Sequence, residues 1–230
     1  MALEGRVVVI TGAKGGLGTT VTEAFLAAGA TVVGISRSIK QTDFTHKNFT
    51  AVQADFSSGA AVSQAAGEIA TRFGRVDALV HVMGGFAGGT VAETDDETWR
   101  RMLDLNLNSG FYAARAFIPY LCKAGSGRVI VVGSKAAESP HAGLAAYVTS
   151  KAALVMLVRT IAAENADAGV TANVVMPGTM DTPGNRSAMP NADFSKWVPP
   201  TDVANLILWL AGEQAGNVNG AVIPISGRDV

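Results

Sequence analysis

The order of apolar segments constrains the fold of this chain more than any other feature. Short runs rich in Val and Ile alternate with longer, Ala-rich segments in which apolar residues recur at helical spacing. The runs that predict strands span residues 6–11, 31–36, 49–54, 77–82, 128–133, 171–176 and 221–226. Helices are predicted over residues 17–28, 59–73, 96–121, 145–167 and 201–212. Such alternation builds parallel sheets through right-handed crossovers, so we expect an α/β protein with a doubly wound sheet and helices on both faces.

Composition agrees with a sheet that is covered on both faces. Hydrophobic residues make up 48% of the chain and charged residues 16%, as a buried parallel sheet requires. A length of 230 residues fits one domain of this kind, spanning residues 1–230. The segment 178–200 is rich in Pro, Asn, Asp and Met, so we expect an irregular loop there that acts as a lid or binding loop.

Charge and cysteine content narrow the class of partner. The formal net charge is −1 and the basic residues do not cluster, so neither nucleic acid nor an anionic membrane is expected as a partner. Cys122 is the single cysteine, which excludes an internal disulfide and agrees with a reducing compartment. The start of the chain does not look like a signal peptide. The apolar run 152–163 is interrupted by Arg159 and is judged too short to span a bilayer. We therefore expect a cytoplasmic protein that acts on a small molecule and holds no metal.

A glycine-rich turn follows the first predicted strand and opens the first predicted helix. It reads TGAKGGLG over residues 11–18 and contains Gly12, Gly16, Leu17 and Gly18. Glycines at this spacing allow a tight turn and a close approach to a pyrophosphate, which the helix N-terminus then binds through free N–H groups. Glycine also occurs in ordinary turns, but the strand before and the helix after favour a nucleotide site.

The end of the second predicted strand indicates which nucleotide is bound. NAD-binding folds place an acid there for the ribose 2′-hydroxyl, whereas this chain has Ser36 and Arg37. Arg37 suits a 2′-phosphate, and Lys14 in the glycine-rich turn adds a second positive charge. We therefore expect NADP(H) in preference to NAD(H), the alternative being that Arg37 is a solvated surface charge. Asp55 follows the third strand and either contacts the adenine or forms a turn.

Four polar residues form a candidate catalytic set. Tyr147 and Lys151 are four residues apart on a predicted helix, so they share one face. The ammonium is expected to lower the pKa of the phenol and to hold the nicotinamide ribose, which makes Tyr147 a general acid or base. Ser134 ends the fifth strand, where its hydroxyl can bind a substrate carbonyl. Asn106 is expected to anchor a water and a helix backbone group behind the lysine.

These motifs, in this order, resemble the short-chain dehydrogenase/reductase family over essentially the whole chain. The resemblance implies a Rossmann-type fold, a proton relay through Asn106, Ser134, Tyr147 and Lys151, and assembly as a homo-dimer or homo-tetramer. It also implies that Pro177, Gly178 and Thr182 hold the nicotinamide carboxamide and phosphates. The family's Asn-Asn-Ala-Gly, which steadies the central sheet, is here His81-Val82-Met83-Gly84. Gly84 keeps its expected place beside the cofactor, and His81 is either a polar core substitute or a site residue.

A narrower resemblance concerns the substrate. Residues 181–197 and 84–89 are similar to segments of dihydropteridine reductases, which implies a pterin or another flat heterocycle. Ser36 and Ser134 depart from those enzymes, and a serine at 134 favours a ketone or alcohol. Three functions therefore stay open: a carbonyl or alcohol oxidoreductase, an enzyme similar to dihydropteridine reductase, and a catalytically silent NADP-binding regulator. The large side chains of the loop, Met189, Phe194 and Trp197, either contact substrate or pin the loop to the body.

Overall fold

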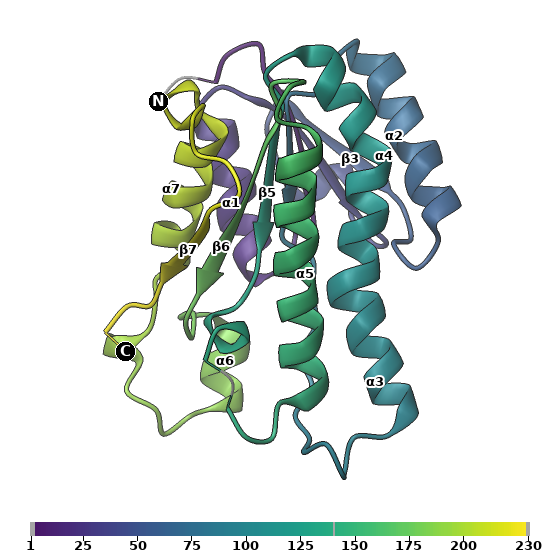
Figure 1. Ribbon diagram of the computed structural model, residues 1–230. Coiled ribbons are helices and arrows are strands. Elements are labelled where there is room, and N and C mark those ends of the chain that lie inside the picture. Colours follow the sequence, from purple (N-terminus) through teal and green to yellow (C-terminus); the bar gives the residue numbers. More distant parts are fainter. Residues whose placement is uncertain (1–2, 140, 229–230) are drawn as a thin grey trace.

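The computed structural model describes residues 3–139 and 141–228 and is built around one parallel sheet. The strand order is β3-β2-β1-β4-β5-β6-β7, and each neighbouring pair is parallel (Figure 1). The strands are β1 Val7–Thr11, β2 Thr31–Ser36, β3 Phe49–Gln53, β4 Ala78–His81, β5 Arg128–Val132, β6 Thr171–Pro177 and β7 Val222–Ile225. Strand order reverses between β1 and β4, which is the switch point of a doubly wound sheet. The predicted fold class is confirmed.

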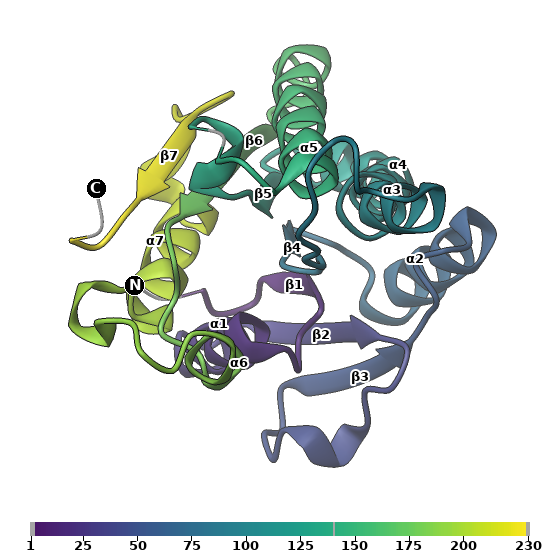
Figure 2. The same ribbon diagram turned by 90° about the horizontal axis from the view of Figure 1, so that it is seen from below.

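Two layers of helices cover the sheet (Figure 2). Helices α1 Gly16–Ala27 and α7 Pro200–Ala211 pack on one face. Helices α2 Gly59–Phe73, α4 Ser109–Ala124 and α5 Ala145–Glu164 pack on the other. Successive residues of a strand point to opposite faces, so β1 contributes to both cores and all five of its residues are buried. This two-sided burial explains the unbroken apolar strands in the sequence.

The helix predicted over residues 96–121 is not continuous. It begins as α3, Asp96–Leu103, passes through a π-helical turn, η2, at Asp104–Asn108, and continues as α4. A π-helical turn widens the helix by one residue and leaves carbonyl groups without their usual partners, so such turns are frequent at functional sites. Here the turn carries Asn106, which is fully buried.

The segment 178–200 is more ordered than expected. It contains a short helix, α6, at Pro183–Ala188 and a 3₁₀ turn, η4, at Phe194–Lys196. The Arg186 guanidinium binds Asp181 at 2.5 and 2.8 Å and lies 4.7 Å from the centre of the Phe194 ring. Trp197 packs against Phe194 and is buried, so these two aromatic rings pin the segment, whereas Met189 is exposed. Figure 1 shows α6 below the carboxyl ends of the strands.

Three further 3₁₀ turns complete the described chain: η1 Gln41–Asp43, η3 Lys135–Ala137 and η5 Glu213–Ala215.

The prediction that the apolar run 152–163 is too short to span a bilayer needs a correction. The run lies within helix α5, which extends beyond it in both directions. At 20 residues it is long and apolar enough, by length and composition, to cross a membrane. In this fold one side of it packs against β6 and α3, as expected of a core helix.

Candidate active site

A cavity of about 640 Å³ opens at the carboxyl ends of β1, β2, β4 and β5. It brings together residues that lie far apart in the sequence. The predicted site residues that line it are Gly12, Lys14, Gly16, Leu17, Gly18, Ser36, Arg37, Asp55, Gly84, Tyr147, Lys151 and Thr182. Four others, Asn106, Ser134, Pro177 and Gly178, lie behind or beside it, as described below. A cavity at the switch point of a doubly wound sheet is the usual position for a dinucleotide.

The glycine-rich turn fits the phosphates of such a ligand. Gly15 precedes α1 and provides no side-chain cap, so the first N–H groups of the helix are open to the cavity. A Cβ atom at Gly18 would collide with the carbonyl oxygen of Gly12, so the close packing of turn and helix requires glycine there. The Ser36 hydroxyl is buried, lines the cavity and has no hydrogen-bond partner among the described residues. Such an orphaned group fits a ligand hydroxyl or phosphate.

Two basic side chains lie at the β2 end of the cavity. Lys14 Nζ donates to the Ser38 carbonyl at 2.9 Å and pairs with Asp43 at 3.1 Å. Arg37 lines the same wall and interacts electrostatically with Asp55. Asp55 accepts from the Ser57 backbone N–H at 2.9 Å, and this bond is the main reason why its pKa is lowered. Asp55 is therefore a turn former that also lines the cavity, and Asp43 is a partner of Lys14 that the sequence motif does not reveal.

Lys151 is a buried cation near the floor of the cavity. Its Nζ donates to the Val132 carbonyl at 2.9 Å, and burial lowers the pKa of its ammonium from 10.5 to about 8. A buried amine of this kind is partly deprotonated just above neutral pH. The ammonium of Lys151 therefore titrates close to physiological pH, and pKa values shifted in this way are common at functional sites.

Tyr147 is held in the same cavity, one helical turn before Lys151. Burial raises the pKa of its phenol, and a hydrogen bond with the Ser134 hydroxyl acts in the opposite direction. The expected lowering by Lys151 is therefore wrong, because loss of solvation outweighs the other influences on the phenol. Phe86, which the sequence motifs missed, packs edge-on against the Tyr147 ring with centroids 5.0 Å apart and is 64% exposed at the cavity.

Asn106 holds the cavity floor from behind. Its side-chain amide donates to the Gly85 carbonyl at 3.1 Å and to Ser150 Oγ at 3.0 Å, and its Oδ1 accepts from the Gly85 N–H at 2.9 Å. The space beside Gly84 is filled by Asn106 Oδ1 and Lys151 Nζ. The expected helix backbone partner is therefore wrong: the π-helical turn aims Asn106 at the backbone of the segment that follows β4, and at a side chain of α5.

His81 lies in the interior, where its pKa is lowered to about 3 by burial and by the nearby Lys151 charge. Its Nδ1 is 2.9 Å from Thr11 Oγ1 and its Nε2 is 3.3 Å from Ser109 Oγ. The interpretation of His81 as a polar core substitute is supported, because both ring nitrogens are used inside the protein and the residue does not line the cavity. Neutral imidazole satisfies its two partners without a buried charge.

In the segment after β6, Thr182 lines the cavity, whereas Pro177 and Gly178 do not. Thr182 lies beside Gly16 and caps α6 by accepting from the Asn185 N–H at 3.3 Å. The Gly178 N–H donates to the Ile225 carbonyl at 2.9 Å, and Pro177 ends β6 beside β7. Met180 and Asn185 also line the cavity; Asn185 belongs to the predicted loop 181–197, whereas no motif singled out Met180. The described residues contain no group of three or more His, Cys, Asp or Glu side chains placed to hold a metal ion.

Comparison with known proteins agrees with this site. The family model described as short chain dehydrogenase matches residues 6–193. The chain is 29% identical to 2-dehydro-3-deoxy-D-gluconate 5-dehydrogenase from Pseudoalteromonas atlantica, covering 98% of this chain and 96% of the relative. It is 28% identical to 3-oxoacyl-[acyl-carrier-protein] reductase from Escherichia coli, covering 99% and 98%.

Solved structures agree as well. A short-chain type dehydrogenase/reductase from Mycobacterium ulcerans superposes with a TM-score of 0.92 at 25% identity, covering 99% of this chain and 90% of the other. The structure of ElxO with NADP bound superposes with a TM-score of 0.90 at 25% identity, covering 96% of this chain and 97% of the other. The match spans most of the chain and the relatives are named dehydrogenases and reductases. The chain therefore belongs to the short-chain dehydrogenase/reductase family and is an NAD(P)-dependent oxidoreductase.

Proposed function

We propose that this enzyme transfers a hydride between NADP(H) and a small carbonyl or alcohol. The observation that carries the proposal is the hydrogen bond between Ser134 and Tyr147, next to the buried Lys151 and at the edge of the cofactor cavity. A serine and a phenol that share one hydrogen bond suit a single oxygen atom of a substrate, as a carbonyl group provides.

In the direction of reduction, NADPH held in the cavity would supply a hydride, which adds to the carbonyl carbon of the substrate. Ser134 donates a hydrogen bond to the carbonyl oxygen, and Tyr147 transfers its phenolic proton to that oxygen, which gives the alcohol. Lys151 holds the nicotinamide ribose and, as an ammonium, stabilises the phenolate that is left. Asn106 keeps Gly84 and Gly85 in place beside Lys151. Pro177, Gly178 and Thr182 would hold the nicotinamide carboxamide and phosphates.

The preference for NADP(H) rests on Arg37 and Lys14 at the end of β2, where Ser36 replaces the acid that would repel a 2′-phosphate. The Arg37→Ala variant loses a charge-assisted phosphate contact, so its affinity for NADPH should fall by about 1.5–3 kcal/mol. Affinity for NADH should stay nearly unchanged. Fluorescence titration with both cofactors measures this. Equal losses for the two cofactors would show that Arg37 does not contact the 2′-phosphate.

The alternative substrate is a quinonoid dihydropterin, and Phe86 supports it as an exposed ring on which a flat heterocycle can stack. A panel of small ketones is assayed with NADPH beside quinonoid dihydropterin, in the native enzyme and in Ser134→Ala. We expect ketone turnover that Ser134→Ala abolishes. Pterin turnover that survives Ser134→Ala would favour the alternative. Absence of turnover with every substrate would favour the third reading, an NADP-binding regulator.

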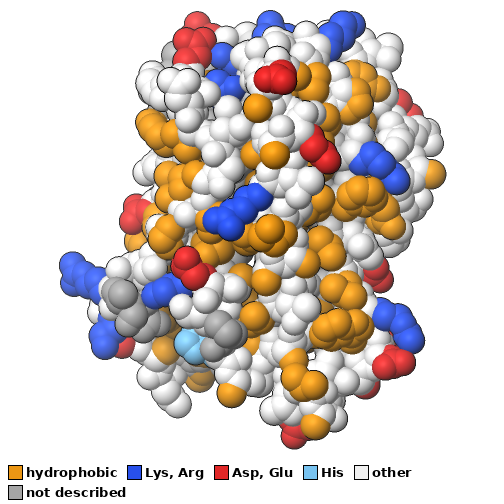
Figure 3. Space-filling view, viewed as in Figure 1, with side chains coloured by type: hydrophobic (Ala, Val, Ile, Leu, Met, Phe, Trp, Pro, Cys, Tyr) orange, Lys and Arg blue, Asp and Glu red, His pale blue; other side chains and the backbone are white. Residues whose placement is uncertain are grey.

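We also propose a cytoplasmic enzyme that assembles as a homo-dimer or homo-tetramer. Trp99 of α3, Phe111 of α4 and Met156 of α5 are large apolar side chains that stay exposed. Figure 3 shows hydrophobic side chains gathered over the face formed by α4 and α5. Apolar patches of this kind mark contacts between proteins. Sedimentation measures the assembly, and Phe111→Lys or Met156→Lys should shift it toward the monomer.

A further inference from the structure

The polar side chains under the active site form one continuous chain centred on His81. Thr11, His81 and Ser109 come from β1, β4 and α4, and all three are buried. The Met83 N–H donates to Thr11 Oγ1 at 3.4 Å, and Thr11 Oγ1 lies 2.9 Å from His81 Nδ1. On the other side His81 Nε2 lies 3.3 Å from Ser109 Oγ, which donates to the Leu105 carbonyl at 2.7 Å.

The direction of each hydrogen bond in this chain follows from the number of protons available. The Ser109 hydroxyl uses its single proton on Leu105, so it can only accept from His81 Nε2–H. A neutral imidazole then has an unprotonated Nδ1, which accepts from the Thr11 hydroxyl. Thr11 in turn accepts from Met83. The hydrogen bonds therefore run in one direction, from the Met83 N–H to the Leu105 carbonyl. A second proton, on His81 Nδ1, would make this atom a donor that faces the Thr11 hydroxyl.

The two ends of the chain lie beside catalytic contacts. Leu105 is the neighbour of Asn106 in the π-helical turn, and Ser109 binds a carbonyl of that turn. Met83 precedes Gly84 and Gly85, and Gly85 exchanges two hydrogen bonds with Asn106. The segment after β4 and the π-helical turn are thus joined twice, once through Asn106 and once through His81. Lys151 Nζ and Asn106 Oδ1 both lie against Gly84.

We infer that His81, as the neutral Nε2–H tautomer, is a positioning residue that fixes the π-helical turn against the nucleotide-binding segment. It thereby holds Asn106 and Gly84 around Lys151. The asparagine that the family usually has at this position has a shorter side chain. Histidine carries its second polar atom, Nε2, one bond farther from the backbone, and here that atom reaches Ser109 of α4.

The tautomer is measured by ¹⁵N NMR of the imidazole rings. The chain has three histidines, and His81→Asn identifies the signal of residue 81. We expect an Nε2–H signal that does not titrate between about pH 5 and 9. An Nδ1–H tautomer, or titration in this range, would overturn the chain of hydrogen bonds. This measurement needs neither substrate nor cofactor.

The positioning role is measured in Ser109→Ala and Thr11→Val. Each variant removes the hydrogen bond on one side of His81. This role rests on the proposed function, in which Lys151 holds the cofactor ribose. The pH dependence of NADPH affinity should bend near the pKa of Lys151, about 8 in the native enzyme. We expect that cutting the connection loosens the contact of Asn106 and Gly84 with Lys151. Its burial then falls, its pKa rises toward 10.5, and the bend should move to higher pH. Turnover of the best ketone should fall about tenfold or more, as misplacement of catalytic groups does.

Thr171→Val is the matched control, because Thr171 is a buried strand threonine whose hydroxyl has no partner. It should leave both the bend and the turnover unchanged. If Ser109→Ala and Thr11→Val lower only the melting temperature and keep the bend and the turnover of the native enzyme, His81 merely fills the core and the inference is wrong. Absence of any bend in the native enzyme would instead contradict the ribose contact of Lys151 in the proposed function.

Discussion

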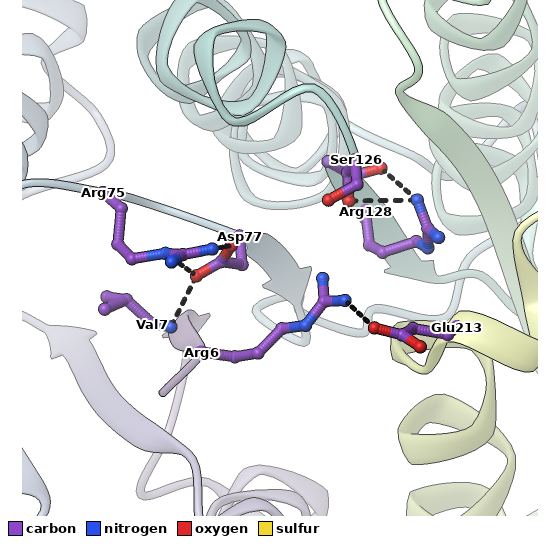
Figure 4. A network of polar contacts seen from close by, with 8 residues as sticks. Arg6, Val7, Arg75, Asp77, Ser126, Arg128 and Glu213 are labelled. Carbon is purple, nitrogen blue, oxygen red and sulfur yellow. Dashed lines mark hydrogen bonds and ion pairs between the residues drawn. The ribbon is translucent and has the colours of Figure 1, made fainter. Parts of the chain in front are cut away.

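The two ends of the sheet both bury charged side chains, but they treat them differently. At the amino end, Figure 4 shows Asp77 between Arg75 and the start of β1. Asp77 is fully buried and accepts from Arg75 at 2.6 and 2.9 Å and from the Val7 N–H at 2.8 Å. At the carboxyl end, the ammonium of Lys151 is equally buried and has one backbone carbonyl as its hydrogen-bond partner. The charge of Asp77 is matched by partners, whereas the charge of Lys151 is held at a cost.

Unpaired polar atoms alone do not distinguish the two ends. Within residues 3–139 and 141–228, Arg6 Nη1 and Arg128 Nε at the amino end are buried without a partner, as is Ser36 Oγ at the carboxyl end. Arg6 reaches Glu213 with its other nitrogen, and Arg128 binds the carbonyls of residues 126 and 127 (Figure 4). Ser36, in contrast, lines a cavity. A functional site therefore needs spare hydrogen-bonding capacity together with open space.

The largest effect is expected at Tyr147. The Tyr147→Phe variant keeps the ring and its contact with Phe86 but loses the proton donor, so turnover should fall about 10²–10⁴-fold. NADPH affinity should change little, because the phenol serves the substrate. Steady-state kinetics and cofactor titration check this. Retention of more than a tenth of the native turnover would mean that Tyr147 is not the proton donor.

At the amino end, Asp77→Ala should destabilise the protein by about 3 kcal/mol, since it leaves the buried Val7 N–H without an acceptor and removes the partner of Arg75. Turnover per folded molecule should stay close to native. Urea unfolding and kinetics measure the two. The control is Asp77→Asn, which keeps an acceptor for Val7 and should lose less. If Asp77→Ala also lowered the turnover per folded molecule, the distinction between a stabilising amino end and a functional carboxyl end would be wrong.

At the carboxyl end, Lys151→Met should have the opposite sign. Removing the buried ammonium should stabilise the protein by about 2 kcal/mol at neutral pH while abolishing turnover. The pKa of Lys151 is about 8 in the folded state and 10.5 ordinarily. Between these pH values, Lys151 carries a proton in the unfolded wild-type protein but not in the folded one. Stability of the native enzyme therefore rises across this range, and the advantage of Lys151→Met should fade there. A destabilised Lys151→Met at pH 7 would show that the charge is not held at a cost.

Local spacing explains how much of this was predictable. The seven strands, both helical layers, the glycine-rich turn and the Tyr147–Lys151 pair depend on residues close together in the sequence, and the structure bears out their positions. The π-helical turn was missed because its signal is a mismatch between the apolar positions of α3 and α4, and each helix taken alone looks regular. Helix α6 is short and rests on its cap at Thr182 and on its contact beside the glycine-rich turn.

The sequence by itself determined the α/β fold and the family, and it supplied the four residues proposed as the catalytic set, because periodicity and motif order are local properties of the chain. The tertiary structure decided how those residues behave. It set the pKa of Lys151, gave Asn106 the backbone of Gly85 as its partner, and placed His81 between Thr11 and Ser109. Burial and hydrogen-bond partners depend on segments that meet only after folding, so no local pattern encodes them.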